Sequence, residues 1–376
     1  MIPFSSKFKL ADYTSYKITK GFMVAFLLSS FIYLEYFGFS AKFINTIFVL
    51  IAYYLLVTID KKSLFFAGFF TGLLWFWWIG YSFIYYDLVY LIPFIVLFFG
   101  VAHGVFFWFT AIVDKVFVRI VMLYLLTFFE PFGFNWFKLD LPLINTYFNT
   151  YESNLKMPNL KINMPSYNIP QDRKWDTRFV NEMIAINLKN IDNAIAKGDD
   201  VVILPETAFP LALNTEEEIL EILKEKSKQI SIVTGAISQN KNEYLNSTYL
   251  FENGTYTVAN KVVLVPFGEE IPLPKFLTDF INDTFFDGAS DYSKASEPTT
   301  FTIKNVKFRN AVCYEATTDK IYQNLDTPFV IATSNNAWFT PSTEPTLQKL
   351  LLRYYAKKYN LIIYHATNSS PNMVVK

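Results

Sequence analysis

The sequence lacks the residues that disulfides and metal sites require. Its 376 residues include one Cys, Cys313, and two His, His103 and His365, which lie in opposite halves of the chain. One Cys excludes an intrachain disulfide, and these Cys and His residues form no metal-binding motif. Net charge is absent as well: 33 basic residues balance 33 acidic ones, whereas nucleic-acid-binding domains present a basic surface. We therefore expect no metal, no cofactor and no nucleic-acid partner.

Apolar and aromatic side chains, by contrast, are abundant. Hydrophobic residues make up 52% of the chain and aromatic residues 19%, with 40 Phe. Residues 21–130 carry most of this excess, whereas residues 150–376 have the composition of a soluble domain. The change falls near Phe148. We predict a membrane domain over residues 1–148, with about five helices and an interfacial segment, and a soluble domain over residues 149–376.

Five apolar stretches in the first half are predicted to span a membrane. A stretch of about 18 or more apolar residues with few charges is typical of a transmembrane helix. No small-residue cleavage site follows the first stretch and more stretches come directly after it, so it is not a cleavable signal. The first carries Glu35, and the last is short and contains Arg119. The predicted spans are Phe22–Phe39, Phe43–Ile59, Leu64–Tyr86, Leu88–Val113 and Val116–Phe129.

The distribution of basic residues predicts the orientation of these spans. Lys residues occur in the N-terminal tail (positions 7, 9, 17 and 20) and in the loops after spans two and four (positions 61, 62 and 115). The loops after spans one and three hold only Lys42 and Asp87. Cytoplasmic loops carry an excess of Lys and Arg. Five crossings from a cytoplasmic start place the soluble domain outside, in the periplasm of a Gram-negative cell.

The second half alternates strand and helix patterns, which is typical of an α/β sheet domain. The predicted helix Thr215–Lys228 begins with Thr215 as an N-cap. An Asn253–Gly254 turn predicts a hairpin. The predicted helices are Thr177–Lys197, Thr215–Lys228 and Glu344–Tyr359. The predicted strands are Leu160–Met164, Val201–Leu204, Ile230–Thr234, Asn246–Phe251, Thr255–Asn260, Val262–Val265, Phe301–Ile303, Ala311–Tyr314, Phe329–Ala332 and Leu361–His365.

Three short motifs place a reactive side chain at or near a strand terminus, where sites of open α/β sheets gather. They are Leu-Pro-Glu-Thr-Ala at 204–208, Asn-Lys-Val-Val-Leu-Val-Pro-Phe-Gly-Glu at 260–269 and Ala-Val-Cys-Tyr-Glu at 311–315. Taken singly, Glu206 reads as a solvated loop acid, Lys261 as a surface lysine and Cys313 as a buried small hydrophobe. Their joint occurrence favours a reactive site.

Five ordered motifs give the chain a clear resemblance. They are Asn-Ile-Pro-Gln with Lys-Trp (168–175), Leu-Pro-Glu-Thr (204–207), Lys-Val-Val-Leu-Val-Pro-Phe-Gly-Glu (261–269), Cys-Tyr-Glu (313–315) and Ser-Asn-Asn-Ala-Trp-Phe (334–339). In this order, behind a polytopic region, they resemble the apolipoprotein N-acyltransferases, a membrane-anchored family of the nitrilase superfamily. The resemblance runs from the membrane spans to the C-terminus. It implies a polytopic α-helical membrane domain plus an α/β nitrilase-like domain with an αββα sandwich, in the bacterial inner membrane.

The same resemblance implies a catalytic triad of Glu206, Lys261 and Cys313. Cys313 would react as thiolate, Glu206 would serve as general base and acid, and Lys261 would stabilise the oxyanion. The implied reaction has two steps. Cys313 takes an acyl chain from a phospholipid as a thioester. The α-amine of the diacylglyceryl-cysteine of an apolipoprotein then accepts it. Both substrates are anchored in the membrane.

Five further positions match the family. Glu269 would orient Lys261 or Cys313 as a second carboxylate, or else be a structural loop acid. Tyr314 and Glu315 would support the nucleophile, with simple packing as the alternative. Trp175 and Trp338 would form a lipid-facing wall, with core packing as the alternative.

The chain also departs from the family pattern. Leu204 replaces a Trp, Asn336 an Asp and Thr340 a Gly, and the strands and last transmembrane helix that follow in the family are absent after Lys376. That portion is either lost in the lineage or cut from the sequence. The alternatives to acyl transfer are hydrolysis of amides or nitriles on the same triad, a non-enzyme (an inactive truncated remnant or a scaffold that binds lipoproteins), and a channel or transporter.

Overall fold

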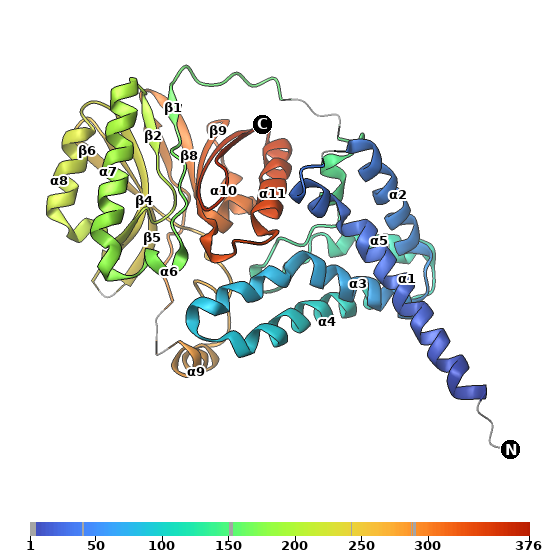
Figure 1. The fold of residues 1–376 in the computed structure, drawn as a ribbon. Coiled ribbons are helices and arrows are strands. Elements are labelled where there is room, and N and C mark those ends of the chain that lie inside the picture. Colours follow the sequence, from blue (N-terminus) through green and yellow to red (C-terminus); the bar gives the residue numbers. More distant parts are fainter. Residues whose placement is uncertain (1–4, 40, 150–152, 242, 287, 289–290) are drawn as a thin grey trace. The chain divides into compact units, whose positions relative to one another are not determined.

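A computed structural model describes residues 5–39, 41–149, 153–241, 243–286, 288 and 291–376 (Figure 1). The chain divides into two compact units. Unit 1 comprises residues 1–131, 135–150 and 341–350, and unit 2 comprises residues 132–134, 151–340 and 351–376.

Unit 1 is built from apolar helices. They are α1 (Ser5–Tyr36), α2 (Lys42–Thr58), α3 (Lys61–Phe76), η1 (Trp77–Tyr86), η2 (Val89–Leu91), α4 (Ile92–Thr110) and α5 (Val116–Leu126), followed by the short turn η4 (Leu141–Asn145). The turn η3 (Pro131–Gly133) is divided between the units after Pro131. Of the described helices, three are long and apolar enough to cross a membrane: Thr14–Tyr36, Lys61–Tyr86 and Val89–Thr110.

Helices form at all five predicted spans, but two of them are shorter than a membrane crossing requires. Helix α2 has 17 residues and α5 has 11. At 1.5 Å per residue these helices are about 26 Å and about 16 Å long, compared with about 30 Å for the hydrocarbon core. The α5 helix ends at Leu126, whereas the apolar stretch continues to Phe129. Apolar composition therefore predicted more helix than the backbone forms.

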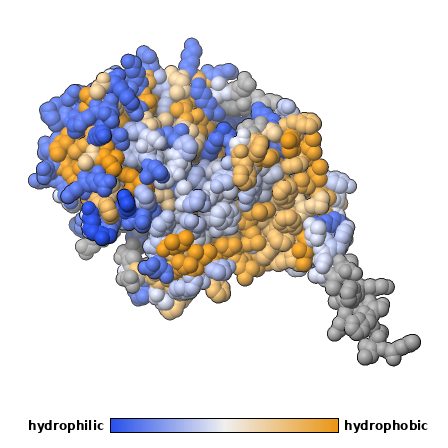
Figure 2. Space-filling view, viewed as in Figure 1, coloured by the Kyte–Doolittle hydropathy of each residue, from blue (hydrophilic) through white to orange (hydrophobic). Residues whose placement is uncertain are grey.

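Helices α3 and α4 pack at very close range through glycine. A Cβ added at Gly68 would lie 2.2 Å from the His103 carbonyl oxygen, and one at Gly72 would lie 2.3 Å from that of Phe99. On the facing helix, a Cβ at Gly104 would meet Phe65 at 2.9 Å. Small residues four positions apart let membrane helices approach closely. The outward side of the same unit is hydrophobic, as the orange surface over these helices shows (Figure 2).

Unit 2 contains two β-sheets within its described residues. One has the order β1-β2-β4-β5-β6, with β3 beside β4, and the other has the order β11-β10-β9-β8-β7. The strands of the first sheet are β1 (Ile162–Asn163), β2 (Val201–Ile203), β3 (Phe209–Ala212), β4 (Ser231–Asn240), β5 (Glu243–Glu252) and β6 (Thr255–Asn260). Those of the second are β7 (Thr300–Ile303), β8 (Val306–Val312), β9 (Phe329–Asn335), β10 (Ile362–Asn368) and β11 (Met373–Val375).

Helices and short helical turns connect many of these strands in the described part of the chain after residue 150. They are α6 (Gln171–Lys174), η5 (Thr177–Phe179), α7 (Val180–Lys197), η6 (Leu213–Thr215), α8 (Glu217–Lys226), α9 (Lys275–Phe285), η7 (Cys313–Thr317), α10 (Asp319–Tyr322), η8 (Asn336–Trp338) and α11 (Glu344–Tyr359). The first part of α11 groups with unit 1 and residues 351–359 group with unit 2.

Three layers of buried apolar side chains make unit 2 an αββα sandwich, as the family resemblance implied. A central layer joins residues of both sheets, including Ile203 and Val233 from the first and Phe308 and Ile331 from the second. The outer face of the first sheet packs against α7 and α8. The outer face of the second packs against α10 and the second part of α11. Strand ends from both sheets are therefore available for one site.

Three local predictions were wrong in detail. Residues 262–265 form no strand, because their N–H groups bond to carboxylates: Val262 and Val263 donate to Glu315, and Val265 donates to Glu269. Helix α8 begins at Glu217, and the Thr215 hydroxyl bonds back to the Ala212 carbonyl instead of capping it. The predicted strand at 311–314 ends at Val312.

Candidate active site

Glu206 lies in the loop after β2 and is buried, with 7% of its surface exposed. Its Oε1 accepts a hydrogen bond from Asn246 Nδ2 at 2.8 Å, and its Oε2 accepts one from the backbone N–H of Asn335 at 2.8 Å. Both carboxylate oxygens are thus fixed, one from each sheet. The alternative in which Glu206 is a solvated loop acid is excluded by its burial.

A glycine on the neighbouring strand makes room for this loop. A Cβ at Gly235 in β4 would lie 2.4 Å from the Thr207 nitrogen and 2.6 Å from the Glu206 Cα. Thr207 also has a positive φ of 44°, which non-glycine residues seldom adopt. Only glycine at position 235 lets the Glu206 backbone pass this close to β4.

Lys261 follows β6 and is fully buried. Its Nζ lies 2.6 Å from Glu269 Oε2. Burial lowers the pKa of Lys261, but the negative charges of Glu269, Glu206 and Cys313 together outweigh it and raise this pKa above its ordinary value. Lys261 therefore carries a positive charge throughout the neutral range, as an oxyanion-stabilising residue requires.

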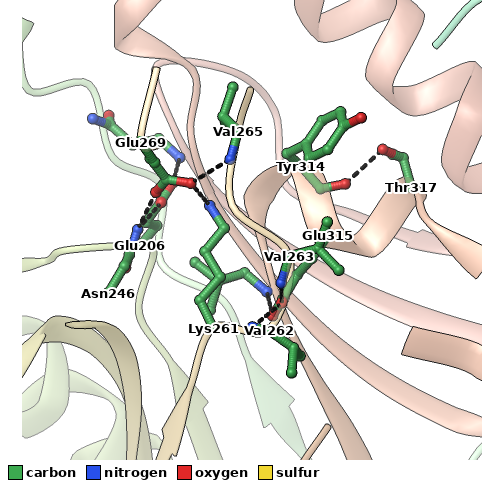
Figure 3. Close-up of polar contacts among 12 residues, drawn as sticks. Glu206, Asn246, Lys261, Val262, Val263, Val265, Glu269, Tyr314, Glu315 and Thr317 are labelled. Atoms are coloured by element: carbon green, nitrogen blue, oxygen red, sulfur yellow. Dashed lines mark hydrogen bonds and ion pairs between the residues drawn. The ribbon is translucent and has the colours of Figure 1, made fainter. Parts of the chain in front are cut away.

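Asn246 on β5 links the two carboxylates. Its Nδ2 donates to Glu206 Oε1 and also to Glu269 Oε1, the latter at 2.9 Å (Figure 3). Glu269 Oε2 accepts in addition from the Val265 N–H at 2.8 Å. Glu269 is therefore bonded to Lys261 directly and to Glu206 through one amide, in the geometry of a carboxylate that orients the lysine.

Cys313 stands at the turn between β8 and η7 and is half-buried. Its φ is 53°, a left-handed conformation in which a residue is held only by the surrounding structure. Its charge acts on both Lys261 and Lys174. The three predicted triad residues thus come together in unit 2, although they originate from β2, β6 and β8.

Glu315 stabilises the turn that contains Cys313. Its Oε1 accepts from the Val312 N–H at 2.7 Å, and its Oε2 accepts from the N–H groups of Val262 and Val263 at 2.7 and 3.1 Å (Figure 3). Burial raises the pKa of Glu315 to about 7, against the opposing effects of Lys261 and these three bonds. The side chain ties the residues before Cys313 to those after Lys261.

The aromatic candidates have different surroundings. Tyr314 is buried and donates its hydroxyl to the Gly133 carbonyl at 2.7 Å. Trp338 in η8 is half-buried. Trp175 is 42% exposed, so core packing does not explain it.

The three departures from the family pattern are accommodated locally. Leu204 is fully buried in the core of the first sheet. Asn336 donates its Nδ2 to the Ser370 hydroxyl at 3.0 Å, and Thr340 donates its hydroxyl to the Asn336 carbonyl at 2.8 Å.

Sequence reasoning missed several residues of this site. Lys174 lies beside Trp175 in the motif at 168–175, which assigns it no role. In the structure its Nζ donates to the Glu206 carbonyl at 2.8 Å. Asn246 lay inside a predicted hairpin strand, with no local signal of its function. Asn335 lies within the Ser-Asn-Asn-Ala-Trp-Phe motif at 334–339, and the sequence around Gly235 carries no local signal of its role.

Comparisons with known proteins agree with this picture. Residues 15–180 match the model of the apolipoprotein N-acyltransferase integral membrane domain. The chain is 40% identical to an apolipoprotein N-acyltransferase of Wolinella succinogenes over 93% of its own length and 94% of that protein. The chain belongs to the apolipoprotein N-acyltransferase family.

Membership in the apolipoprotein N-acyltransferase family makes the chain an acyltransferase enzyme with an integral membrane domain. A second relative, from Campylobacter jejuni, is 36% identical over 96% of this chain and 90% of its own length. Among solved structures, a CN-hydrolase superfamily protein from Xanthomonas campestris has a TM-score of 0.43 and 16% identity, covering 56% of this chain and 77% of that protein. An amidase from a Nesterenkonia species has a TM-score of 0.42 and 12% identity, covering 59% of this chain and 83% of its own.

Proposed function

We propose that the enzyme transfers an acyl chain from a membrane phospholipid, through a thioester at Cys313, to the α-amine of the diacylglyceryl-cysteine at the N-terminus of an apolipoprotein. The observation that carries this proposal is the buried network of Glu206, Asn246, Glu269 and Lys261 beside the turn that holds Cys313. It combines a base, a fixed cation and a nucleophile in one site.

The first step uses all three triad residues. Glu206 takes the thiol proton, and the Cys313 sulfur attacks the carbonyl carbon of the phospholipid ester. The negative charge that develops on the carbonyl oxygen is stabilised by Lys261, a contribution of about 3–4 kcal/mol for one such donor. The ester C–O bond breaks, Glu206 returns the proton to the leaving alcohol, and lysophospholipid departs.

The second step repeats the chemistry with an amine. The neutral α-amine attacks the thioester carbonyl, Glu206 takes the excess proton, and the Cys313 thiolate leaves. Glu269 keeps Lys261 in place during both steps through its 2.6 Å ion pair. Glu315 and Tyr314 act as positioning residues for the Cys313 turn, since their bonds end on the main chain around it or on Gly133.

Substrate access is assigned to aromatic side chains and the membrane helices. The exposed Trp175 and the half-buried Trp338 are proposed to form a wall facing lipid. We assign residues 1–148 to membrane anchoring and residues 149–376 to catalysis. The inner membrane and the periplasmic side follow from the basic N-terminal tail. Three crossings and five crossings both place the catalytic domain on the side opposite the N-terminus, because both numbers are odd.

The proposal is tested by transfer of a labelled acyl chain. Purified enzyme in detergent or vesicles receives acyl-labelled phospholipid and a diacylated lipopeptide, in parallel with Cys313→Ala and Glu206→Gln. We expect the parent to produce labelled lipopeptide and lysophospholipid, and Cys313→Ala to produce neither. Lysophospholipid without labelled lipopeptide would mean that water is the acceptor. Undiminished transfer by Cys313→Ala would refute the assigned nucleophile.

A further inference from the structure

Lys174 is a second buried lysine at the candidate site. Only 2% of its surface is exposed, and its Nζ donates a 2.8 Å hydrogen bond to the backbone carbonyl of Glu206. Lysine is almost never fully buried unless it is paired. A carbonyl oxygen alone does not neutralise a buried ammonium group, so its burial needs negative charge nearby.

The groups that act on Lys174 are those of the proposed reaction. Burial lowers the pKa of Lys174 to about 7, while the negative charges of Glu206 and Cys313 oppose this shift. The same two groups act on Lys261, together with Glu269, and Lys261 in turn acts on Glu315. Lys261 already has its own counter-ion in Glu269. Lys174 therefore provides a second positive charge that acts on Glu206 and Cys313.

The short helix that carries Lys174 is linked to Glu206 in two ways, directly through Lys174 and indirectly through Asn335. Gln171, at the other end of α6, accepts a hydrogen bond from Asn335 Nδ2 at 2.8 Å. The Asn335 backbone N–H donates to Glu206 Oε2, also at 2.8 Å. Asn368 completes the arrangement, because its Nδ2 donates to Asn335 Oδ1 at 2.8 Å. Helix α6 thus holds the Glu206 main chain through Lys174 and the Asn335 side chain through Gln171, and Asn335 in turn bonds the Glu206 carboxylate.

We propose that Lys174 is a positioning residue that holds the Glu206 main chain and supplies the second positive charge that stabilises the Cys313 thiolate. The idea rests on the proposed function, since it presumes that Cys313 is the nucleophile. Without Lys174, Glu206 and Glu269 would face Lys261 as the one buried cation among the described residues of the site. Loss of the Cys313 proton to solvent in the free enzyme would then add a third negative charge. An opposite charge within a few ångström shifts an ionisation by about one to three pH units.

The test is the pH dependence of Cys313 alkylation by iodoacetamide. Cys313 is the one cysteine of the chain, so labelling reports on it alone, and no lipid substrate is needed. In Lys174→Met, the midpoint of the rate profile should rise by about one pH unit or more. In Lys174→Arg, which keeps the charge, it should stay close to that of the parent. Thioester formation should slow in the first variant and recover in the second.

The neighbouring Arg173 provides the matched control. It is exposed, and its guanidinium lies over the Phe179 ring, so Arg173→Met removes the same charge one residue away. It should leave the Cys313 profile unchanged. A folded Lys174→Met with the parental profile, or an equal rise in Arg173→Met, would overturn the proposal.

Loss of folding in Lys174→Met is also informative. Combining it with Glu206→Gln removes one charge of each sign, so a need for charge balance predicts recovery of the folded protein. No recovery would mean that Lys174 acts through packing alone, against the proposal. The proposed function is tested by a different experiment. If Cys313→Ala still transferred acyl chains, Cys313 would not be the nucleophile, but the measured effect of Lys174 on Cys313 alkylation would stand unchanged.

Discussion

Helices α4 and α8 show how differently the two units use their side chains. In unit 1, α4 exposes Phe94 and Phe98 and buries Gly100, His103 and Gly104. In unit 2, α8 exposes Glu217 and Glu218 and buries Leu220 and Leu223. Against lipid there is no hydrophobic gain from burying a phenylalanine, so close packing of small residues stabilises the helices. Against water, burial of leucine stabilises them.

The interiors differ as well. Around its candidate site unit 2 buries Lys174, Glu206, Lys261 and Glu315. Such charges are tolerated only with partners, and each of these four has hydrogen bonds or an ion pair. Unit 1 buries Arg119, whose guanidinium bonds the carbonyls of Val57 and Ile59 at the end of α2. Most buried charged side chains in the described part of unit 2 therefore lie around the candidate site, with Arg309 as the exception.

The largest effect is expected from Lys261→Met, which breaks the buried ion pair with Glu269. Removing one partner of such a pair costs about 3–5 kcal/mol of stability. Acyl transfer should fall on the order of 10²–10³-fold from loss of the oxyanion donor. Thermal unfolding and initial transfer rates measure the two effects. The control is Lys275→Met, since the exposed Lys275–Asp279 pair should contribute nothing measurable. Equal effects of the two variants would contradict the buried-charge account.

A pH-dependent effect of similar size is expected for Glu315, whose pKa rises from 4.5 unfolded to about 7 folded. Between these values the folded state holds a proton that the unfolded state has lost. Its contribution to stability is therefore greatest at low pH and declines by about 3 kcal/mol as pH rises to about 7.

The measurement is the free energy of unfolding of the parent and of Glu315→Gln from pH 5 to 8. The His365 pKa, lowered by burial to about 3, gives the opposite slope below its unfolded value of 6.5. The His365 contribution cancels when the free energy of unfolding of one protein is subtracted from that of the other. This difference should stop changing with pH above about pH 7. A difference that is constant from pH 5 to 8 would show that Glu315 does not titrate in this range.

A smaller effect is expected in the membrane helices from Gly68→Ala. The new methyl group would meet the His103 carbonyl, at 2.2 Å before any adjustment, so α3 and α4 must separate. Overpacking of this kind costs about 1–3 kcal/mol. Gly100→Ala should cost less, because its Cβ would meet the flexible Leu73 and Phe69 side chains at 3.0 Å. Thermal unfolding in detergent compares them, and the reverse order would refute glycine-dependent packing.

The smallest effect on stability is expected from Trp175→Ala. The side chain is 42% exposed, so stability should change by no more than about 0.5 kcal/mol. Acyl transfer should nevertheless fall if the ring contacts lipid. Trp75→Ala is the contrasting variant, because Trp75 is fully buried in unit 1 and bonds the Ser29 hydroxyl, and its loss should cost about 3–5 kcal/mol. Unchanged transfer by Trp175→Ala would remove Trp175 from the proposed lipid wall.

Local patterns predicted most elements of the fold. Helix α11 begins and ends at the predicted residues, and the hairpin of β5 and β6 turns at Asn253–Gly254. The failures lie where side chains from distant residues replace backbone partners. Val262 and Val263 have the composition of a strand, but Glu315, more than 50 positions later, takes their N–H groups. Strand propensity could not anticipate this competitor.

The sequence by itself determined the membrane half, the alternation of strands and helices, and the three motifs of Glu206, Lys261 and Cys313, because hydrophobic periodicity and short motifs are local properties. Only the tertiary structure decided how the site is connected. Asn246 bridges two carboxylates, Gly235 makes room for the Glu206 loop, and Lys174 reaches the Glu206 carbonyl. These contacts join residues 23 to 40 positions apart. They depend on how strands of the folded sheets lie side by side, which no single segment specifies.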